Sequence, residues 1–394
     1  MSQTRKPKHI PDVIVLDILA KLRVKSVMRF RCLGKFWNSS ITSPYFISTH
    51  VNNINNNNNK DLDHRQILHM PRRLNRLNRQ VCTVAFDHTF DAIFEVKVPF
   101  DFCYSNTRIV GSCNGLLCLS GYGPDSDTVI YLWNPSIRKY KKLPDRGVPH
   151  SQTFGFAYHS ENNDYKVVRI SRTGLTVDDI EVYTLSSDSW RRINGISLRT
   201  DVFLNNFNGG LPIPLVGGAL HWLGEILGKE KRWRRKRIII SFDVNSETFR
   251  EIAVPDGSMD TSASQPCVAL FKGKLAAIAI GSDGKRGKQY SIWVMKEYGV
   301  VESWHKLFVV PFQSPSHYVA ITEYGSLLIR YPIEKHSSKE EDEYKSVIVD
   351  AATLHERDTN IQDLDSYAAT FMESLALLDG SNVVSYSRKI VDVE

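Results

Sequence analysis

Twelve histidines, six cysteines, a glycine-rich stretch and a basic run are the residues of this 394-residue chain whose types could do chemistry. The chain contains neither the His-Glu-x-x-His spacing of a zinc peptidase nor the Gly-x-Ser-x-Gly turn of a serine hydrolase. His221 stands between apolar residues in GALHWLG, which favours a hydrogen-bonded structural histidine over a ligand. We therefore predict no catalytic residue, no cofactor-binding residue and no metal site, and a chain that is not an enzyme.

The glycine-rich stretch Gly281–Gly287 reads GSDGKRG and lacks both the Gly-Lys-Ser/Thr ending and the following helix of a phosphate-binding loop. This pattern predicts a solvated hairpin loop. The cysteines form no Cys-x-x-Cys pair, and Cys113 and Cys118 fall in a predicted strand-turn, where two small buried apolar groups are expected. We expect a reduced chain without structural disulfides or zinc.

The basic run 229–237, KEKRWRRKR, carries a net charge of +6, close to the +7 of the whole chain. The rest of the chain is therefore nearly neutral, which argues against nucleic-acid binding. A solvated loop, a nuclear-import signal and a contact for an acidic partner all remain open for this run. The basic residues in question are Lys231, Arg232, Arg234, Arg235, Lys236 and Arg237.

The composition, 42% hydrophobic and 24% charged, is typical of a soluble globular protein. No apolar run approaches the length needed to span a bilayer, and the N-terminus MSQTRKPKHIPD has no apolar core of a secretory signal. We expect an intracellular protein of the cytoplasm, the nucleus or both, without a membrane partner.

Residues 10–50 predict three short helices. Asp12 can cap the first, Ser26 the second, and the third follows Gly34; Ser43-Pro44 then opens a last short element. Helices this short cannot bury all their apolar side chains among themselves, so we expect one face to be left for a partner. The alternative is an ordinary helical hairpin packed on its own domain.

The asparagine tract at 52–59, NNINNNNN, predicts a flexible linker, which we place over residues 51–80. From Val81 onward helical periodicity nearly disappears. The chain therefore divides into a helical module at 8–50, a linker at 51–80 and a β-rich domain at 81–390.

An internal repeat dominates the β-rich domain. An aromatic residue followed three positions later by an aliphatic one recurs at Tyr140, Trp190, Phe249 and Trp304, with intervals of 50, 59 and 55 residues. In the first three copies a second aromatic stands seven positions earlier, and in the fourth Trp293 stands eleven positions earlier. This spacing predicts hairpins with cross-strand aromatic partners.

A second motif, Gly-x-Leu, recurs out of phase at Gly115, Gly218, Gly273 and Gly325. Two hairpins per unit of about fifty residues predict a β-propeller of five to six blades, with a β-sandwich or unrelated hairpins as the alternative. We expect the ring to close by strands from 81–100 and 369–390 sharing a blade. The predicted fold class is thus α+β by segregation, a small helical module followed by a mainly β propeller.

The N-terminal stretch resembles an F-box, the module that docks onto the Skp-type adaptor of cullin-RING ubiquitin ligases. The segments IPD (10–12), VKS (24–26) and FRC (30–32), together with Trp37 and Ser43-Pro44, have the order and spacing of that family. Two positions depart from it: Ile10 replaces a leucine, and Arg23 replaces a frequent proline. The first change is conservative, and the second removes a helix stop without removing an apolar contact.

The β-rich part resembles the F-box-associated, kelch-like domain of flowering-plant F-box proteins, including the F-box/kelch-repeat and S-locus F-box groups. The match lies in GSCNGLLCL (111–119), LWNPSIRKYKKLP (132–144), FGFAYHSENNDYKVVRI (154–170) and IEVYTLSSDSWRRI (180–193). True kelch repeats carry a Gly-Gly doublet in each blade, and here only Gly217-Gly218 stands at a comparable place.

This resemblance implies the substrate-recognition subunit of a Skp-cullin-F-box ubiquitin ligase, which captures a target protein on the propeller for ubiquitination and degradation. Its expected partners are a Skp-type adaptor, through it a cullin-RING scaffold, and a target protein. The residues expected to contact the adaptor are Pro11, Leu16, Leu19, Leu22, Val27, Phe30 and Trp37. The alternative is a propeller-based ligand- or glycan-binding protein, or an enzyme, whose helical N-terminus is merely structural.

Overall fold

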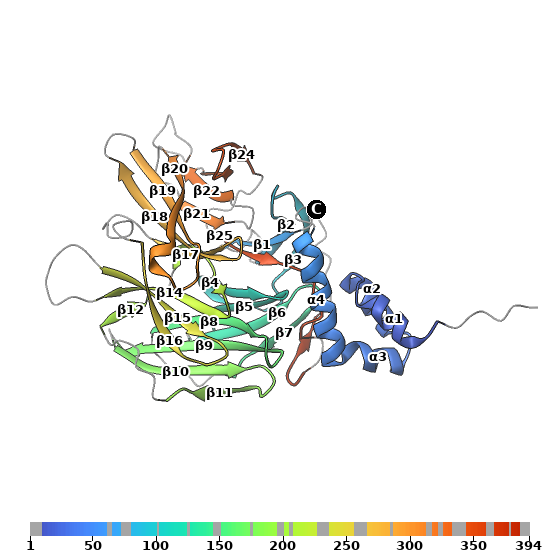
Figure 1. The fold of residues 1–394 in the computed structure, drawn as a ribbon. Coiled ribbons are helices and arrows are strands. Elements are labelled where there is room, and N and C mark those ends of the chain that lie inside the picture. The colour runs from blue at the N-terminus through green and yellow to red at the C-terminus, as the bar shows by residue number, and fades with distance from the viewer. Residues whose placement is uncertain are drawn as a thin grey trace, which may run out of the picture.

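The computed structural model shows a group of N-terminal helices beside a ring of β-sheets (Figure 1). The residues it describes are 10–60, 65–71, 80–100, 102–123, 127–144, 151–173, 176–194, 201–204, 208–226, 236–255, 266–283, 287–312, 317–321, 326–332, 344–359, 366–377 and 380–386. Within them, no helix is long and apolar enough to cross a membrane.

The helical part consists of α1 (Asp12–Leu19), α2 (Val24–Arg31), α3 (Lys35–Thr42) and α4 (Pro44–Lys60). The first three confirm the predicted short helices. Ser43 caps α4, since its Oγ accepts a hydrogen bond from the Phe46 backbone N–H at 3.2 Å, and Pro44 occupies the first helical position, which suits its fixed φ.

Two predicted helix starts are wrong in detail. Asp12 does not cap α1 but lies in its first turn, because Pro11 occupies the N-cap position and makes no side-chain cap. Helix α2 begins at Val24, after Arg23, two positions before the Ser26 cap that we expected. Buried Val24 and Val27 pack into the module, and this packing decides where α2 begins.

The predicted flexible linker over 51–80 is wrong in two places. The asparagine tract continues α4, and Gln66–Pro71 forms strand β1 of the propeller. Tertiary contacts outweigh the weak helix propensity of asparagine: the Asn53 side chain donates to the Ala20 carbonyl at 3.2 Å, and that of Asn55 donates to Asn114 Oδ1 at 3.2 Å. The residues 61–64 and 72–79 lie outside the described part of the chain.

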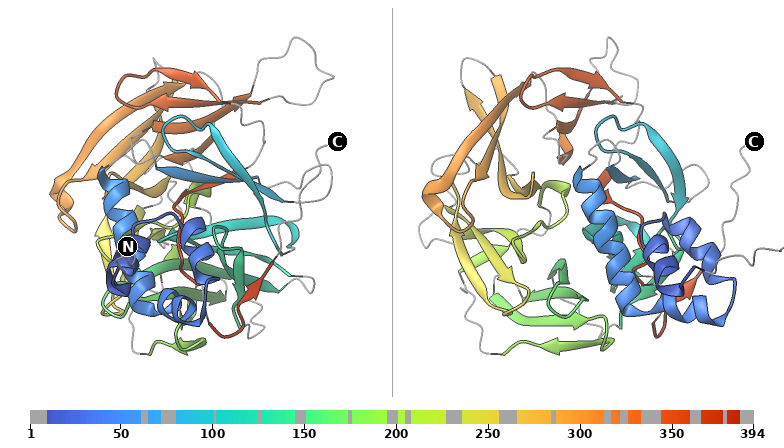
Figure 2. Two further views of the ribbon diagram at one scale, coloured as in Figure 1. Left: turned by 90° about the vertical axis from the view of Figure 1, so that its right-hand side faces the viewer. Right: turned by 45° about the vertical axis from the view of Figure 1, so that its right-hand side comes forward.

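The strands form six antiparallel sheets arranged in a ring, which confirms the propeller and the range of five to six blades (Figure 2). We call the sheets blades A to F. Blade A contains β25 (Ser366–Phe371), β1, β2 (Val81–Phe86) and β3 (Ala92–Lys97). Blade B contains β4 (Cys103–Cys113), β5 (Leu116–Tyr122), β6 (Thr128–Asn134), β7 (Lys139–Lys142) and β26 (Val384–Ser385).

The other four blades follow in chain order. Blade C contains β8 (Ser151–His159), β9 (Asp164–Thr173), β10 (Thr176–Thr184) and β11 (Ser189–Arg192). Blade D contains β12 (Val202–Leu204), β13 (Leu215–Val216), β14 (Ala219–Ile226), β15 (Lys236–Asp243) and β16 (Phe249–Ala253). Blade E contains β17 (Cys267–Phe271), β18 (Lys274–Asp283), β19 (Gly287–Met295) and β20 (Trp304–Phe312). Blade F contains β21 (His317–Ile321), β22 (Ser326–Pro332), β23 (Tyr344–Asp350) and β24 (Glu356–Asp358).

The ring closes in blade A, where the C-terminal strand β25 pairs with β1, and β1 pairs with β2. The expected sharing of one blade by strands from 81–100 and 369–390 is thus confirmed for residues 369–371 of β25, with β1 between them, but it is wrong for Val384–Ser385. The chain then continues past blade A and adds β26 to the outer edge of blade B. Pairing of this kind removes the exposed edge of β7.

The repeated aromatics are cross-strand partners, as predicted: Trp133 faces Tyr140, Tyr183 faces Trp190, and Phe242 faces Phe249. The fourth copy differs, because its longer loop pairs Trp304 with Met295.

Two of these tryptophans also join neighbouring blades. The indole N–H of Trp190 donates to the Pro144 carbonyl at 2.7 Å, and that of Trp304 donates to the Ala253 carbonyl at 2.9 Å. Each acceptor lies four positions after the repeat aromatic of the preceding blade. The fifty-residue period therefore encodes contacts between blades as well as within them.

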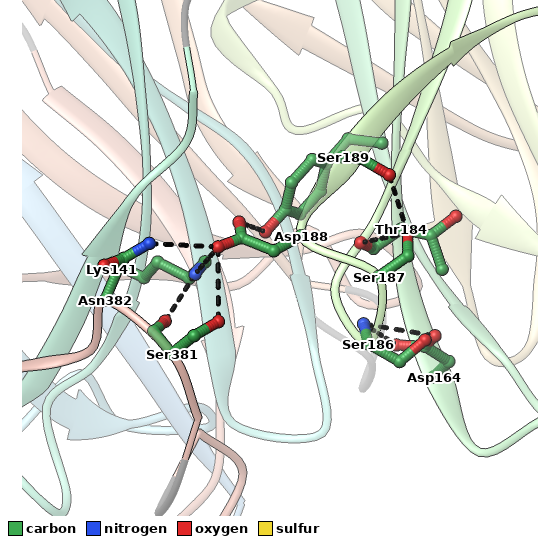
Figure 3. A network of polar contacts seen from close by, with 10 residues as sticks. Lys141, Asp164, Thr184, Ser186, Ser187, Asp188, Ser189, Ser381 and Asn382 are labelled. Carbon is green, nitrogen blue, oxygen red and sulfur yellow. Dashed lines mark hydrogen bonds and ion pairs between the residues drawn. The ribbon is translucent and has the colours of Figure 1, made fainter.

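A polar network joins blades B and C to the C-terminal segment (Figure 3). The buried Lys141 ammonium donates to Asp188 Oδ2 at 2.8 Å and to the Ser381 carbonyl at 2.5 Å. Tyr183 donates to the other Asp188 oxygen at 2.9 Å, and Asn382 donates to Oδ2 at 3.2 Å. Burial acts to raise the pKa of Asp188, but the hydrogen bonds from Lys141 and Tyr183 outweigh it and hold that pKa below its ordinary value.

The Gly-x-Leu motifs at Gly115 and Gly273 mark tight turns between the first two strands of blades B and E, and the motif at Gly218 marks the turn between β13 and β14 of blade D. Gly115, Gly218 and Gly273 have φ of 75°, 78° and 75°, a region in which glycine is favoured. Gly325 lies outside the described residues. Gly115 is also closely approached, because a Cβ there would lie 2.3 Å from the Met372 carbonyl oxygen, whereas a Cβ on Gly273 would meet nothing within 4 Å.

The substitution Gly115→Ala should lower the melting temperature more than Gly273→Ala. Both variants place alanine at the same positive φ, which costs about 1 to 3 kcal/mol, but only the first collides with the segment after β25. Calorimetric melting of the two variants beside wild type measures this difference. Equal losses would show that segment 372–377 does not press on the Asn114–Gly115 turn.

The substitution Asp188→Asn should cost about 1 to 3 kcal/mol at neutral pH, because the buried Lys141 ammonium loses its ionised partner. Since the folded state lowers the pKa of Asp188, its ionised form contributes its full stabilisation above the ordinary pKa of 3.8. This contribution is lost as the pH falls through the lowered pKa, so the stability gap between wild type and variant should shrink in acid. Urea unfolding of both proteins between pH 3 and 7 measures the gap, and a constant gap would contradict the assignment.

Candidate functional site

Helices α1–α3 and the start of α4 build a small module with its own core. Val24, Val27, Ile41 and Phe46 are buried in it, together with Leu19, which is 1% exposed. We refer to α1–α3 as the docking module. It stands to one side of the propeller, with α4 between the two (Figures 1 and 2).

The seven residues predicted to contact an adaptor divide into three groups. Leu19 and Val27 lie in the core of the docking module, so their side chains have almost no surface to offer a partner. Pro11 is exposed. The others pack half-buried against the core; they are Leu16, Leu22, Phe30 and Trp37.

The structure adds apolar side chains that the sequence reasoning missed. Ile14 and Ile18 are each 49% exposed and lie one turn apart on α1, while Leu33 and Phe36 are 68% and 52% exposed. The Phe36 ring meets the half-buried Trp37 edge-on, with centroids 5.1 Å apart. Other exposed apolar residues of the helices are Ile10, Val13 and Tyr45. Exposed apolar groups in such number are typical of an interaction surface.

The sequence could not show which apolar side chains are buried and which are exposed. Helix α1 (DVIVLDIL) is apolar nearly all round, so its periodicity does not show which side faces inward. The choice follows from where α4 and the propeller lie. Ile137, at the β6–β7 turn, and Leu375, after β25, are buried in the same cluster as Leu19 and Ile41. They fix which side of the docking module faces the propeller.

The segment that carries Leu375 is itself held by blade B. The Asn134 side chain donates to the carbonyls of Ser374 at 3.0 Å and Ala376 at 2.7 Å, and its Oδ1 accepts from the Ser136 N–H at 2.9 Å. Asn134 is fully buried, so these bonds are shielded from water. The docking module is therefore mounted on the propeller by residues that are far apart in the sequence.

The remaining sequence candidates are structural where the chain is described. His221 is fully buried, its Nε2 lies 2.8 Å from the Tyr298 hydroxyl, and burial lowers its pKa to about 4, which confirms a structural histidine.

The glycine-rich stretch and the cysteines are structural as well. Asp283 pairs with Gly287 at the end of the β18–β19 hairpin, as expected for a hairpin loop. Cys118 is buried, as predicted, and Cys113 is half-buried. The described residues include no group of three or more His, Cys, Asp or Glu side chains that could hold a metal ion.

The basic run is inserted between β14 and β15, and its residues up to Arg235 lie outside the described part of the chain. Lys236 is exposed, whereas Arg237 is buried with its Nε 3.6 Å from Glu225 Oε1. The last pair of β14 and β15 before the run is Ile226 with Lys236. This pair lies at the opposite end of β14 from the Gly217-Gly218 turn.

Comparison with known proteins matches residues 63–329 to the model of an F-box associated beta propeller domain. The F-box/kelch-repeat protein At3g23880 of Arabidopsis thaliana is 25% identical over 77% of this chain and 80% of its own length. The F-box protein CPR1 of the same plant is 28% identical over 76% of this chain and 73% of its own length. The F-box protein At3g07870 is 29% identical, with 77% and 73% covered.

The matched region covers most of the propeller, and the helical docking module precedes it in the chain. The resemblance seen in the repeats of the β-rich part is thereby confirmed. The chain belongs to the family of plant F-box proteins that carry an F-box associated β-propeller domain.

Proposed function

We propose that this protein is the substrate-recognition subunit of a Skp-cullin-F-box ubiquitin ligase. The docking module binds a Skp-type adaptor, the propeller captures a target protein, and the target is ubiquitinated and degraded. The observation that carries this proposal is the apolar surface of α1 and α3: Ile14, Ile18 and Phe36 are about half exposed on a module whose own core is already filled.

The chain contributes binding and positioning, and the transfer chemistry belongs to the ubiquitin-charged enzyme that the scaffold brings. Holding a target near that enzyme raises its effective concentration. This effect requires that the docking module and the propeller keep a fixed relation, and the buried contacts of Ile137 and Leu375 with the module core support it.

For the basic run, a contact with an acidic target and a nuclear-import signal both remain proposals. The described ends of its hairpin lie at the end of blade D away from the Gly217-Gly218 turn.

The double substitution Ile14→Glu, Ile18→Glu should weaken binding to a purified Skp-type adaptor roughly a hundredfold, because two apolar contacts are replaced by charges that must lose water on binding. Since both side chains are about half exposed, the melting temperature should stay near that of wild type. Calorimetric titration of the full chain measures the affinity.

A matched control is Leu307→Glu, Val309→Glu on strand β20, where the side chains are 38% and 37% exposed on the propeller. This control should bind the adaptor like wild type. Undiminished binding by the α1 variant, or no binding by folded wild type, would overturn the proposed docking surface.

The substitution Leu375→Ala should loosen the mount between the two parts. Removing this fully buried side chain costs about 2 to 5 kcal/mol, and the loss falls on the cluster that joins α1–α3 to the propeller. Amide hydrogen exchange in α1–α3 should therefore speed up while exchange in blades D to F stays unchanged.

The matched control is Leu377→Ala, two positions later, whose buried side chain belongs to the core between blades B and C. It should leave exchange in α1–α3 as in wild type. Identical exchange patterns in both variants would show that Leu375 does not hold the docking module.

A further inference from the structure

Residues 208–214, between β12 and β13, cross the centre of the propeller. At one end the buried Asn208 side chain brackets Val268 of blade E, accepting from its N–H at 2.9 Å and donating to its carbonyl at 3.0 Å. At the other end the Ile213 N–H donates to the Val110 carbonyl of blade B at 3.0 Å. Blades B and E stand on opposite sides of the six-bladed ring, so this segment spans it.

Two hollows lie along the ring axis, and the crossing segment separates them. The smaller, about 20 Å³, is lined by the earlier parts of the inner strands β4, β8 and β25, at Arg108, Phe154 and Tyr367. The larger, about 440 Å³, is lined by the later parts of the same strands. Leu211 and Ile213 line both, so the segment forms a floor. Among the described residues, the segment closes one end of the space along the ring axis, and we call the larger hollow the blind cavity.

The blind cavity faces the side of the propeller on which α4 lies. A second hollow of about 180 Å³ adjoins it and shares Ser112, Asn114 and Thr370 as lining. This outer hollow is bounded by Asn55 of α4 and by Arg65, so it forms a mouth between the helix and the propeller.

The mouth is polar. Gln66 and the buried Asp87 also line it.

The walls of the blind cavity carry no formal charge. The described lining residues include no Asp, Glu, Lys, Arg or His, and large apolar groups such as Ile67, Phe156 and Leu215 supply much of the surface. The titratable groups among them are neutral near pH 7, since burial raises the pKa of the Cys113 thiol to about 12 and that of the Tyr158 hydroxyl above its ordinary value. Such walls disfavour ions, because a charge here would lose its water without gaining a partner.

We propose that this blind cavity is a binding site for a neutral, largely apolar organic molecule. Its apolar body lies on the floor formed by Leu211 and Ile213, and its other end lies towards the polar mouth. The volume of about 440 Å³ lies within the range of pockets that enclose drug-sized ligands. This site is distinct from the docking surface on α1–α3.

The test uses the purified full chain and two fluorescent probes that differ by one charge. N-phenyl-1-naphthylamine is neutral and has an N–H donor, and 8-anilinonaphthalene-1-sulfonate is the same framework with a sulfonate. We expect saturable 1:1 binding of the neutral probe with an affinity about tenfold higher than that of the anion, because the sulfonate must be desolvated in uncharged walls.

The substitution Thr370→Trp should reduce the affinity for the neutral probe at least about tenfold. Thr370 is exposed and lines both the cavity and its mouth, so an indole at this position takes up the space of the ligand. The matched control is Ser189→Trp, on the outer strand β11, where the side chain is also exposed. The double variant Ile14→Glu, Ile18→Glu removes apolar surface from α1 and should bind the probe like wild type.

Melting curves establish that each variant is folded. The site is supported if Thr370→Trp loses binding of the neutral probe while Ser189→Trp and the double variant Ile14→Glu, Ile18→Glu keep it. Absent or non-saturable binding in wild type, equal binding in Thr370→Trp, loss in the α1 variant, or preference for the anion would each overturn the proposal.

Discussion

The pairing of β25 with β1 is the constraint on which the rest of this structure depends. It joins two strands that are about three hundred residues apart in the sequence. When this pairing forms, the last strand of the ring completes the first blade, and the ring of six blades is closed. Closing so long a loop costs conformational entropy, which the pairing must offset together with the contacts that it brings into place.

Those contacts include the segment that follows β25. Once the ring is closed, Ser374 and Ala376 lie where Asn134 can bind their carbonyls, and Leu375 enters the core of the docking module. Farther on, Ser381 and Asn382 reach Asp188. Ring closure, mounting of the docking module and the junction of blades B and C are therefore coupled through one stretch of about fifteen residues.

Through these contacts the helices and the ring pack against each other. The docking module turns an apolar surface outward, while α4 lies along the side of the propeller at which the central cavity opens. The opposite side of the ring carries the hairpin from which the basic run extends.

The sequence by itself determined most of the elements and their order, but not the length of α4 or the presence of β1. Short helices between Pro11 and Ser43, aromatic pairs seven positions apart and glycines at tight turns are local patterns, and local patterns fix which residues form a helix, a hairpin or a turn. The blade count was also within reach, because the repeat length follows from the spacing of Tyr140, Trp190, Phe249 and Trp304.

Only the tertiary structure decided what depends on contacts between distant residues. The asparagine tract became part of α4 because Ala20 and Asn114 hold it, against its local propensity. Leu19 faces inward and Ile18 outward, although both are apolar, because Ile137 and Leu375 set the inner side. The floor of the cavity arose from bonds between residues 208–213 and blades B and E. None of these contacts leaves a periodic signal in the chain, because burial and partners at long range are properties of the packed ring.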